Sequence, residues 1–297
     1  MSTVDPAANL PREASSAASS AEQDTRPAWD RIARGYDRTN TETQLALGTQ
    51  AVGRVELRSG MRFLDVAAGS GALGIPAARL GARVLAVDQS PMMLELLRAR
   101  AQREGLEVET RVMDGHALDL EDASFDIAGS QFGVMLFHDM PRGIREMKRV
   151  LRPGGRVLIV AYGDPGRIDF LSFFVEVVRA LRPSFSGPPV DPPPLAFQLQ
   201  DAARLANELA SAGLAEIRVD TITEATEFRS GKGLWDWILC SNPIVEDVLC
   251  SLQISRDERA TLERRAGEAF REHAGHGGVA RLVNPVNIAV ATRPAPR

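Results

Sequence analysis

A β-rich run that ends in a glycine turn is the feature that most constrains this chain. Residues 64–74 read LDVAAGSGALG, and a helix can begin where the run ends. Glycine lets a backbone turn sharply and approach a ligand closely, and a helix amino end offers free N–H groups to a carboxylate or phosphate. Gly69, Gly71 and Gly74 also match the dinucleotide pattern G-x-G-x-x-G. The stretch predicts a nucleotide-type cofactor site on an α/β fold.

The pattern around this turn alternates between strands and helices. Strands are expected at 63–67, 83–87, 108–112, 125–128 and 156–161, with helices that include 92–103 and 142–151. Strands separated by helices of this length are typical of βαβ units, which build a parallel sheet covered on both faces. We therefore expect function at the carboxyl ends of the strands.

The chain divides into three predicted parts. Residues 1–26 are rich in Ala and Ser, carry acidic residues that argue against a secretory or transit peptide, and are interpreted as a disordered tail. Residues 27–163 form the core, which begins with helices at about 27–36 and 45–52. Residues 164–297 complete the core and insert a helical cap. The elements expected in this last part are helices near 168–181, 201–212, 234–252 and 256–273, strands at 216–222 and 287–292, a stiff proline segment at 187–194, and a helix break at Asn242-Pro243.

Composition argues against several classes of function. The net charge of −4 and the pI near 5.7 give no overall attraction to a nucleic acid. No apolar run is long enough to cross a bilayer. Cys240 and Cys250 are too few for a disulfide framework or a zinc site. We expect reduced thiols, a cytoplasmic protein, and no bound metal.

Three carboxylates distinguish between the cofactors that a glycine turn can hold. Asp88 follows the glycines by about twenty residues, at the end of the second strand, where it can accept from both ribose hydroxyls of either cofactor. Asp65 lies at the end of the strand before the glycines, where a carboxylate can pair with the cationic amino-acid part of S-adenosylmethionine (SAM). Asp114 follows the third strand and can accept from an adenine amino group. This set favours SAM over a nicotinamide cofactor.

With these motifs in order, residues 29–163 resemble the class I SAM-dependent methyltransferases, and within them the ubiquinone/menaquinone C-methyltransferase-like (methyltransferase type 11) group. The resemblance also draws on Ser124-Phe125-Asp126 and on the turn at 150–157. It implies a Rossmann-like, doubly wound, mostly parallel seven-stranded sheet with helices on both faces and a helical cap. It further implies a site for SAM, with S-adenosylhomocysteine as product. The implied cofactor residues are Tyr36, Asp65, Ala67, Gly69, Ser70, Gly71, Asp88, Gln89, Met93, Asp114, Gly115, His116 and Gln131.

The resemblance also implies what these residues do. Residues 69–71 line the methionine part of SAM, residues 88–89 bind the ribose, and residues 114–116 surround the adenine. Gln131 lies beside the sulfonium, and Met93 packs on the adenosine. Tyr36 resembles the amino-terminal tyrosine that closes over the cofactor. Ala67 departs from the family, because many relatives carry a glycine there, and should make the loop slightly fuller.

The acceptor side has weaker signals. Bulky aromatic residues gather outside the recognised core, and we expect Phe170, Phe174, Phe197 and Trp235 to line an apolar substrate pocket, although some must pack the cap's own core. His138 follows the fourth strand and could act as a general base, because its unperturbed pKa lies near neutrality. A lone histidine is more often structural.

These observations predict methyl transfer to O, N or C of a hydrophobic or aromatic small molecule. An NAD(P)-dependent oxidoreductase is one alternative, opposed by Asp65, by Asp114 and by the lack of a Tyr-x-x-x-Lys pair. A nucleic-acid methyltransferase is another, opposed by the lack of a base-flipping signature and of a basic stripe. A SAM-binding protein without catalysis is a third. The sequence leaves open the acceptor, the accepting atom, the need for a base, and the oligomeric state, with a homo-oligomer among the options.

Overall fold

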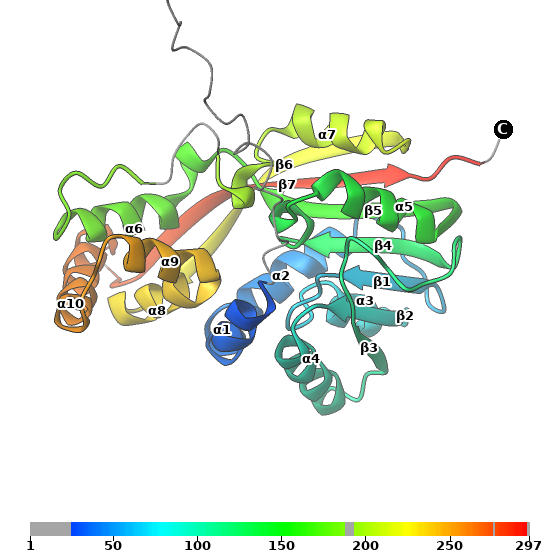
Figure 1. The fold of residues 1–297 in the computed structure, drawn as a ribbon. Coiled ribbons are helices and arrows are strands. Elements are labelled where there is room, and N and C mark those ends of the chain that lie inside the picture. The colour runs from blue at the N-terminus through cyan, green and yellow to red at the C-terminus, as the bar shows by residue number, and fades with distance from the viewer. Residues whose placement is uncertain (1–24, 188–192, 276, 296–297) are drawn as a thin grey trace, which may run out of the picture.

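The computed structural model describes residues 25–187, 193–275 and 277–295 of the 297-residue chain. Most of the predicted tail and of the predicted proline segment lies outside these residues. Within them the chain forms two lobes joined by a long pair of strands (Figure 1). No helix in the described part is long and apolar enough to cross a membrane.

A seven-stranded sheet forms the larger lobe, and its strand order is β3-β2-β1-β4-β5-β7-β6. The first five strands in the chain run parallel, and β7 runs antiparallel to both of its neighbours. The strand order reverses between β1 and β4, the place where open α/β sheets bind ligands. This arrangement confirms the predicted fold class. The strands are β1 Arg62–Val66, β2 Arg83–Asp88, β3 Val108–Val112, β4 Phe125–Gln131, β5 Leu151–Tyr162, β6 Ala215–Phe228 and β7 Ala280–Thr292.

Helices cover both faces of this sheet because alternate apolar residues of its strands point to opposite sides. Leu64, Val66 and Ile159 pack with α5 and α7 on one face. Phe63 and Val84 pack with α2 and α3 on the other, where α4 also lies. The helices of this lobe are α1 Arg26–Thr39, α2 Thr41–Val52, α3 Gly74–Arg79, α4 Pro91–Arg103, α5 Met140–Val150 and α7 Ala202–Ser211.

A two-stranded arm carries the smaller, helical lobe. Tyr162 of β5 pairs with Val286, but β6 and β7 stay paired as far as Phe228 and Ala280. Residues 280–285 of β7 therefore pair with β6 alone, which extends the arm about 20 Å beyond β5. The lobe consists of α6 Asp169–Arg179, α8 Gly231–Ser241, α9 Pro243–Ser251 and α10 Arg256–His273 around an aromatic core.

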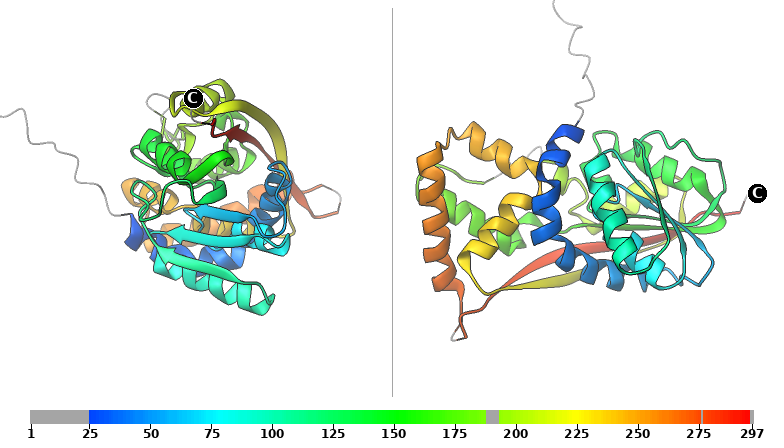
Figure 2. Two further views of the ribbon diagram at one scale, coloured as in Figure 1. Left: turned by 90° about the vertical axis from the view of Figure 1, so that its right-hand side faces the viewer. Right: turned by 90° about the horizontal axis from the view of Figure 1, so that it is seen from below.

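Three short 3₁₀ helices complete the described elements: η1 Val134–Leu136, η2 Pro165–Arg167 and η3 Leu195–Phe197. Helix α1 lies between the two lobes and contacts both α8 and α4 (Figure 2). A Cβ added at Gly35 of α1 would come within 2.6 Å of Cys240 Sγ on α8. Helix α1 therefore has the helical lobe on one side and the sheet lobe on the other.

The structure corrects several predicted boundaries. The predicted strands at 216–222 and 287–292 are both longer, because they continue into the arm. The predicted helix at 234–252 is two helices, and the expected break is confirmed: Asn242 is extended, with φ −159° and ψ 139°, and Pro243 begins the next helix. The predicted boundary at 163 falls directly after β5.

Candidate cofactor and acceptor site

The glycine loop lies at the carboxyl edge of the sheet, across the end of a neighbouring strand. The Ala68 N–H donates to the Val87 carbonyl at 3.0 Å, which holds the loop against β2. Gly69 has φ +53°, and a Cβ added there would have no neighbour within 4 Å. Gly71 has φ +100°, and its added Cβ would lie 2.8 Å from Ile75. Gly69 thus leaves an open side for a ligand, whereas Gly71 lets the loop pack on the helices below.

Asp65 is almost completely buried under this loop, with 1% of its surface exposed. Its Oδ2 accepts a hydrogen bond of 2.7 Å from the Gly74 N–H at the start of α3. Burial, with a smaller effect from the charge of Asp88, raises the pKa of Asp65 to about 7 in spite of the backbone hydrogen bonds that lower it. A cationic group nearby would restore the charged form, so this carboxyl can respond to an ammonium ligand.

Asp88 ends β2 and is held by backbone N–H groups on both of its oxygens. Gly69 donates to Oδ2 and Ser90 donates to Oδ1, both at 2.8 Å. Burial raises the pKa of Asp88 against these hydrogen bonds. Each carboxylate oxygen keeps a lone pair for a further donor, so two vicinal hydroxyls could bind to the fixed carboxylate. This geometry fits the ribose role predicted for Asp88.

Asp114 is paired with a histidine that the sequence analysis placed only beside the adenine. Its Oδ1 accepts from the His116 N–H at 2.9 Å and lies 2.7 Å from His116 Nδ1. Burial raises the pKa of Asp114, but the bonds and charge of His116, with Arg142, outweigh it and lower the pKa overall. The buried His116 Nε2 has no hydrogen-bond partner in the described chain. A polar ligand atom could satisfy it.

His138 lies against this histidine. The two imidazole rings are 4.3 Å apart, and Phe137 lies 4.4 Å from His116. A Cβ added at Gly115 would come within 2.4 Å of the Phe137 ring, so only glycine fits there. His138 is exposed and lies beside the predicted adenine position. Its role as a base stays a prediction.

Helix α1 covers the end of β2 and brings Tyr36 to the site. Burial, with a smaller effect from the charge of Asp88, raises the pKa of Tyr36. Asp30 of α1 accepts a hydrogen bond of 2.5 Å from the Ser90 hydroxyl. Arg100 of α4 binds Asp37 at 2.9 Å and Glu42 at 2.8 Å. Polar contacts therefore fasten the helix that carries Tyr36 onto the sheet lobe.

Helix α2 supplies two site residues that the sequence analysis missed. Thr41 shares a hydrogen bond of 2.7 Å with the hydroxyl of Ser70 in the glycine loop. Gln131 Nε2 donates to the Gln44 backbone and side-chain oxygens at 2.9 and 3.0 Å. The buried Gln131 Oε1 has no partner in the described chain, and it lies at the end of β4, where the resemblance puts the sulfonium. No spacing rule links α2 to these positions.

The remaining predicted cofactor residues surround the same edge. Met93 is buried in the first turn of α4, whose N-cap Ser90 accepts from the Met93 N–H. Gln89 Nε2 donates to the Thr25 hydroxyl at 2.5 Å. Ala67 adopts φ +55°, a left-handed conformation that strains a residue with a Cβ. This explains physically why a glycine suits the position.

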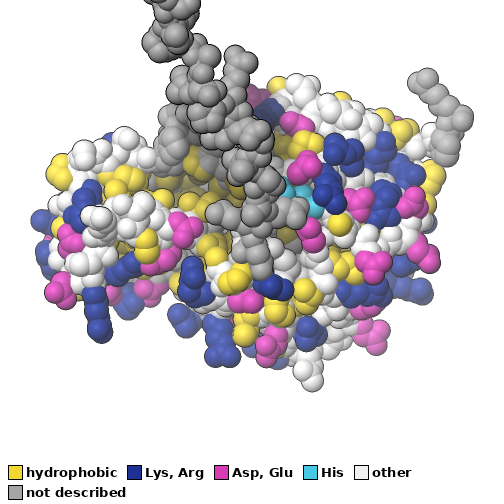
Figure 3. All heavy atoms as spheres, in the orientation of Figure 1, with side chains coloured by type: hydrophobic (Ala, Val, Ile, Leu, Met, Phe, Trp, Pro, Cys, Tyr) yellow, Lys and Arg dark blue, Asp and Glu magenta, His cyan; other side chains and the backbone are white. Residues whose placement is uncertain are grey.

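A wall of aromatic rings extends from this edge into the helical lobe. Tyr162, at the end of β5, stacks on Phe132 at 4.3 Å and lies 5.5 Å from Phe170. Phe170 lies 5.4 Å from Trp237, which lies 5.6 Å from Phe228. Hydrophobic side chains gather where the two lobes meet (Figure 3). The wall therefore follows the junction of the lobes, next to the predicted sulfonium position.

The four predicted pocket residues do not lie together. Phe170 and Phe197 are near Tyr162, with ring centroids at 5.5 and 6.4 Å. Phe174 and Trp235 instead stack on each other at 5.9 Å inside the core of the helical lobe. Tyr162 and Trp237, which the sequence analysis did not select, take part in the wall. Tyr162 directly follows a predicted strand, so the carboxyl-end rule could have found it.

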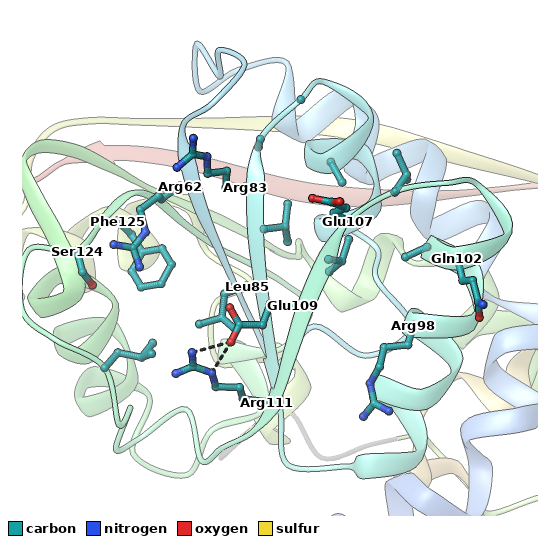
Figure 4. A pocket seen from close by; sticks show the side chains of 18 of the residues that line it. Arg62, Arg83, Leu85, Arg98, Gln102, Glu107, Glu109, Arg111, Ser124 and Phe125 are labelled. Atoms are coloured by element: carbon teal, nitrogen blue, oxygen red, sulfur yellow. Dashed lines mark hydrogen bonds and ion pairs between the residues drawn. The ribbon is translucent and has the colours of Figure 1, made fainter.

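One large hollow, of about 1260 Å³, lies at the opposite edge of the sheet. It is lined by the first residues of β1 and β2, Arg62 and Arg83, with Arg98, Arg111 and Glu109 around it (Figure 4). None of the glycine-loop residues takes part. Its arginines are balanced by acidic residues, and Arg111 pairs with Glu109 at 2.6 Å. This hollow is separate from the cofactor site.

Comparisons with known proteins agree with this geometry. A family model described as a methyltransferase domain matches residues 64–159. An uncharacterized protein of Mycobacterium tuberculosis is 35% identical over 161 residues, which are 54% of this chain and 57% of that protein. A demethylmenaquinone methyltransferase of Corynebacterium glutamicum is 31% identical over 182 residues, which are 59% of this chain and 76% of that protein. A solved putative methyltransferase from Bacillus halodurans has a TM-score of 0.54 and 19% identity, covering 84% of this chain and 99% of that chain.

Fold, motif order and relatives define the class together. The chain belongs to the class I SAM-dependent methyltransferases, in the ubiquinone/menaquinone C-methyltransferase-like group. The matched segment covers 57% of the length of the mycobacterial relative, a little more than half. The site residues fit SAM. Gly69 leaves open space beside the loop, both oxygens of Asp88 are held in place by backbone N–H groups, and Gln131 Oε1 has no hydrogen-bond partner in the described chain. All three lie at the carboxyl edge of the sheet.

Proposed function

We propose that this protein transfers a methyl group from SAM to an O, N or C atom of a hydrophobic or aromatic small molecule, in the cytoplasm. The observation that carries the proposal is that Asp65 and Asp88 both accept hydrogen bonds from the glycine-loop region, at the edge of the sheet where the strand order reverses. A nicotinamide-binding fold usually has an apolar side chain at the position of Asp65.

SAM supplies an activated methyl group on a sulfonium. The protein has to bind both reactants at attack distance and keep water out, which can provide several kcal/mol of the barrier. In the proposal, Asp65 holds the amino-acid end, Asp88 holds the ribose, and Asp114 with His116 holds the adenine. Tyr36 and α1 close the cofactor off from water. The aromatic wall orients the acceptor.

The test is calorimetric titration with S-adenosylhomocysteine on three proteins. Wild type should bind it saturably. Asp88→Ala should bind at least about tenfold more weakly, because each hydrogen bond to a charged group contributes roughly 1.5–3 kcal/mol. Asp119→Ala is the matched control, since this exposed carboxyl lines the separate hollow at the opposite edge of the sheet, and the affinity of the variant should stay unchanged.

Thermal melting of each variant separates loss of binding from loss of folding. If the folded wild type ignores S-adenosylhomocysteine and binds NAD(P)H instead, the oxidoreductase alternative replaces the proposal. If binding is present, incubation with SAM and candidate acceptors, followed by mass spectrometry, measures turnover. A protein that binds SAM but methylates nothing in such a screen would contradict the catalytic part.

A further inference from the structure

The β6–β7 arm carries a polar cluster inside the aromatic junction of the lobes. Glu224 of β6 pairs in register with Asn284 of β7, and Thr226 lies two residues further along β6. Paired residues, and residues two apart, share one face of a strand pair. The Thr226 hydroxyl donates to Glu224 Oε1 at 2.7 Å, and Asn284 Nδ2 donates to Glu224 Oε2 at 3.1 Å. The three side chains form one cluster.

This cluster has more acceptors than donors. Asn284 is 2% exposed, and its Oδ1 has no hydrogen-bond partner in the described chain. The Glu224 carboxylate receives only the two neutral donors, and no Lys, Arg or His among the described residues pairs with it. A buried acceptor without a donor is destabilising, and the partly buried Glu224 carboxylate would gain a charge-assisted hydrogen bond from a cation. A ligand with cationic N–H groups would satisfy both oxygens.

Aromatic rings stand on the same side of the arm. Tyr162 pairs with Val286, two residues from Asn284 on β7, and therefore shares its face. Burial, with the neighbouring Tyr36 and the charge of Glu224, raises the pKa of Tyr162, which indicates that the Tyr162 hydroxyl is near that carboxylate. Phe228 lies on the face of Glu224 and contacts Trp237. Ring faces attract cations as well as apolar groups.

The cluster is also connected to the cofactor site. Tyr162 stacks on Phe132 at 4.3 Å, and Phe132 directly follows Gln131, the residue predicted to lie beside the sulfonium. A small molecule bound along the aromatic wall could therefore have one end at Glu224 and another facing the predicted sulfonium position.

We infer that the methyl acceptor is an amine, recognised as its ammonium form by Glu224 and Asn284, with its hydrocarbon part on the rings of Tyr162 and Phe170. The inference rests on the proposed function, because it names the substrate class of the same site. It assigns recognition to the ammonium, whichever atom of the molecule is methylated. A neutral phenol or quinol would leave the Glu224 charge without a cationic partner.

The experiment compares two probes of similar shape, 2-phenylethylamine and 2-phenylethanol, by calorimetric titration of the protein saturated with S-adenosylhomocysteine. Wild type should bind the amine at least about tenfold more tightly, as one charge-assisted hydrogen bond predicts. Glu224→Gln should reduce this preference to less than about threefold. Glu227→Gln is the matched control, because Glu227 is exposed and lies on the other face of the same strand, and it should keep the preference.

Asn284→Ala keeps the test decisive if Glu224→Gln does not fold. It removes the unpartnered Oδ1 acceptor and should weaken amine binding at least about threefold. Unchanged amine binding would overturn the inference. Equal or undetectable binding of the two probes by wild type, or an equal loss in Glu224→Gln and Glu227→Gln, would also overturn it while leaving the methyltransferase proposal intact. Amine preference without any binding of S-adenosylhomocysteine would support the ammonium site and contradict the proposed function.

Discussion

The two lobes position their functional groups in different ways. In the sheet lobe, backbone N–H groups from strand ends and turns hold the carboxylates of Asp65 and Asp88. In the helical lobe and along the arm, rings from segments far apart in sequence, such as Phe170 and Trp237, pack on one another. The cofactor half therefore depends on backbone geometry, which repeats at fixed spacing, whereas the acceptor half depends on side-chain packing, which does not.

The lobes also have separate hydrophobic cores. The core of the helical lobe is built around Phe174, Trp235 and Phe270. The sheet lobe packs its own clusters around residues such as Leu64 and Phe63. The β6–β7 arm and the segment from β5 to α6 connect them covalently. Because stability varies locally with packing, damage to one core should leave the other folded.

The strongest test of this separation is Phe174→Ala. Truncating a buried phenylalanine typically costs about 3–5 kcal/mol, and Phe174 loses its contacts with Trp235 and Phe185. We expect faster amide hydrogen exchange in α6, α8 and α10 and unchanged exchange in β1 and β4. Affinity for S-adenosylhomocysteine should stay within about twofold of wild type, because Phe174 belongs to the core of the helical lobe.

Phe170→Ala is the matched control for the acceptor side. Phe170 is only partly buried and contacts Tyr162, so its truncation should cost less stability and should weaken acceptor binding more than Phe174→Ala does. Equal acceleration of exchange in β1 and in α8 of the Phe174→Ala protein would show that the two lobes unfold as one unit.

A smaller effect concerns the charge of Asp65. With a pKa of about 7, this carboxyl is protonated at lower pH, so binding of an ammonium group should release a proton. Affinity for S-adenosylhomocysteine should fall by up to about tenfold for each pH unit below 7 and level off above it. Titration in buffers of different ionisation enthalpy measures the released proton.

Asp65→Asn keeps an acceptor for the Gly74 N–H and should remove both the proton release and this pH dependence. The variant also tests stability. The folded pKa of about 7 lies above the ordinary 3.8, so this group makes the free energy of unfolding fall as pH rises between about 4 and 7. In Asp65→Asn this contribution to the pH dependence of the free energy of unfolding should be absent. Affinity that is independent of pH in wild type would mean that Asp65 only holds the start of α3.

The sequence predicted the sheet lobe well because its signals are local. Alternation of strands and helices, the glycine loop and the spacing to Asp88 all follow from backbone requirements of a βαβ unit. The five parallel strands and the helices at 92–103 and 142–151 are confirmed within a few residues. The helix expected to open at the end of the glycine turn is confirmed as α3, which begins at Gly74.

The arm and the acceptor side could not be predicted in the same way. Pro285 argues against a strand, because proline lacks an N–H, but the structure tolerates it where β7 has no β5 partner, and its carbonyl accepts from Gly163. Phe174 and Phe170 look alike in sequence, and only the packing separates a core residue from one at the junction. Thr41 and Gln44 reach the site through the path of α2, which no motif records.

The smallest expected effect concerns the departure of Ala67 from the family. Its φ of +55° should cost about 1 kcal/mol, so Ala67→Gly should stabilise the protein by about 0.5–1 kcal/mol. Ala68 is the matched control, because it is buried and is not among the residues with positive φ, so Ala68→Gly should destabilise by about 1 kcal/mol. Urea unfolding of both variants measures whether each substitution raises or lowers the free energy of unfolding. Destabilisation by both would mean that the methyl group of Ala67, which faces Gly133, contributes more by packing than its backbone conformation costs.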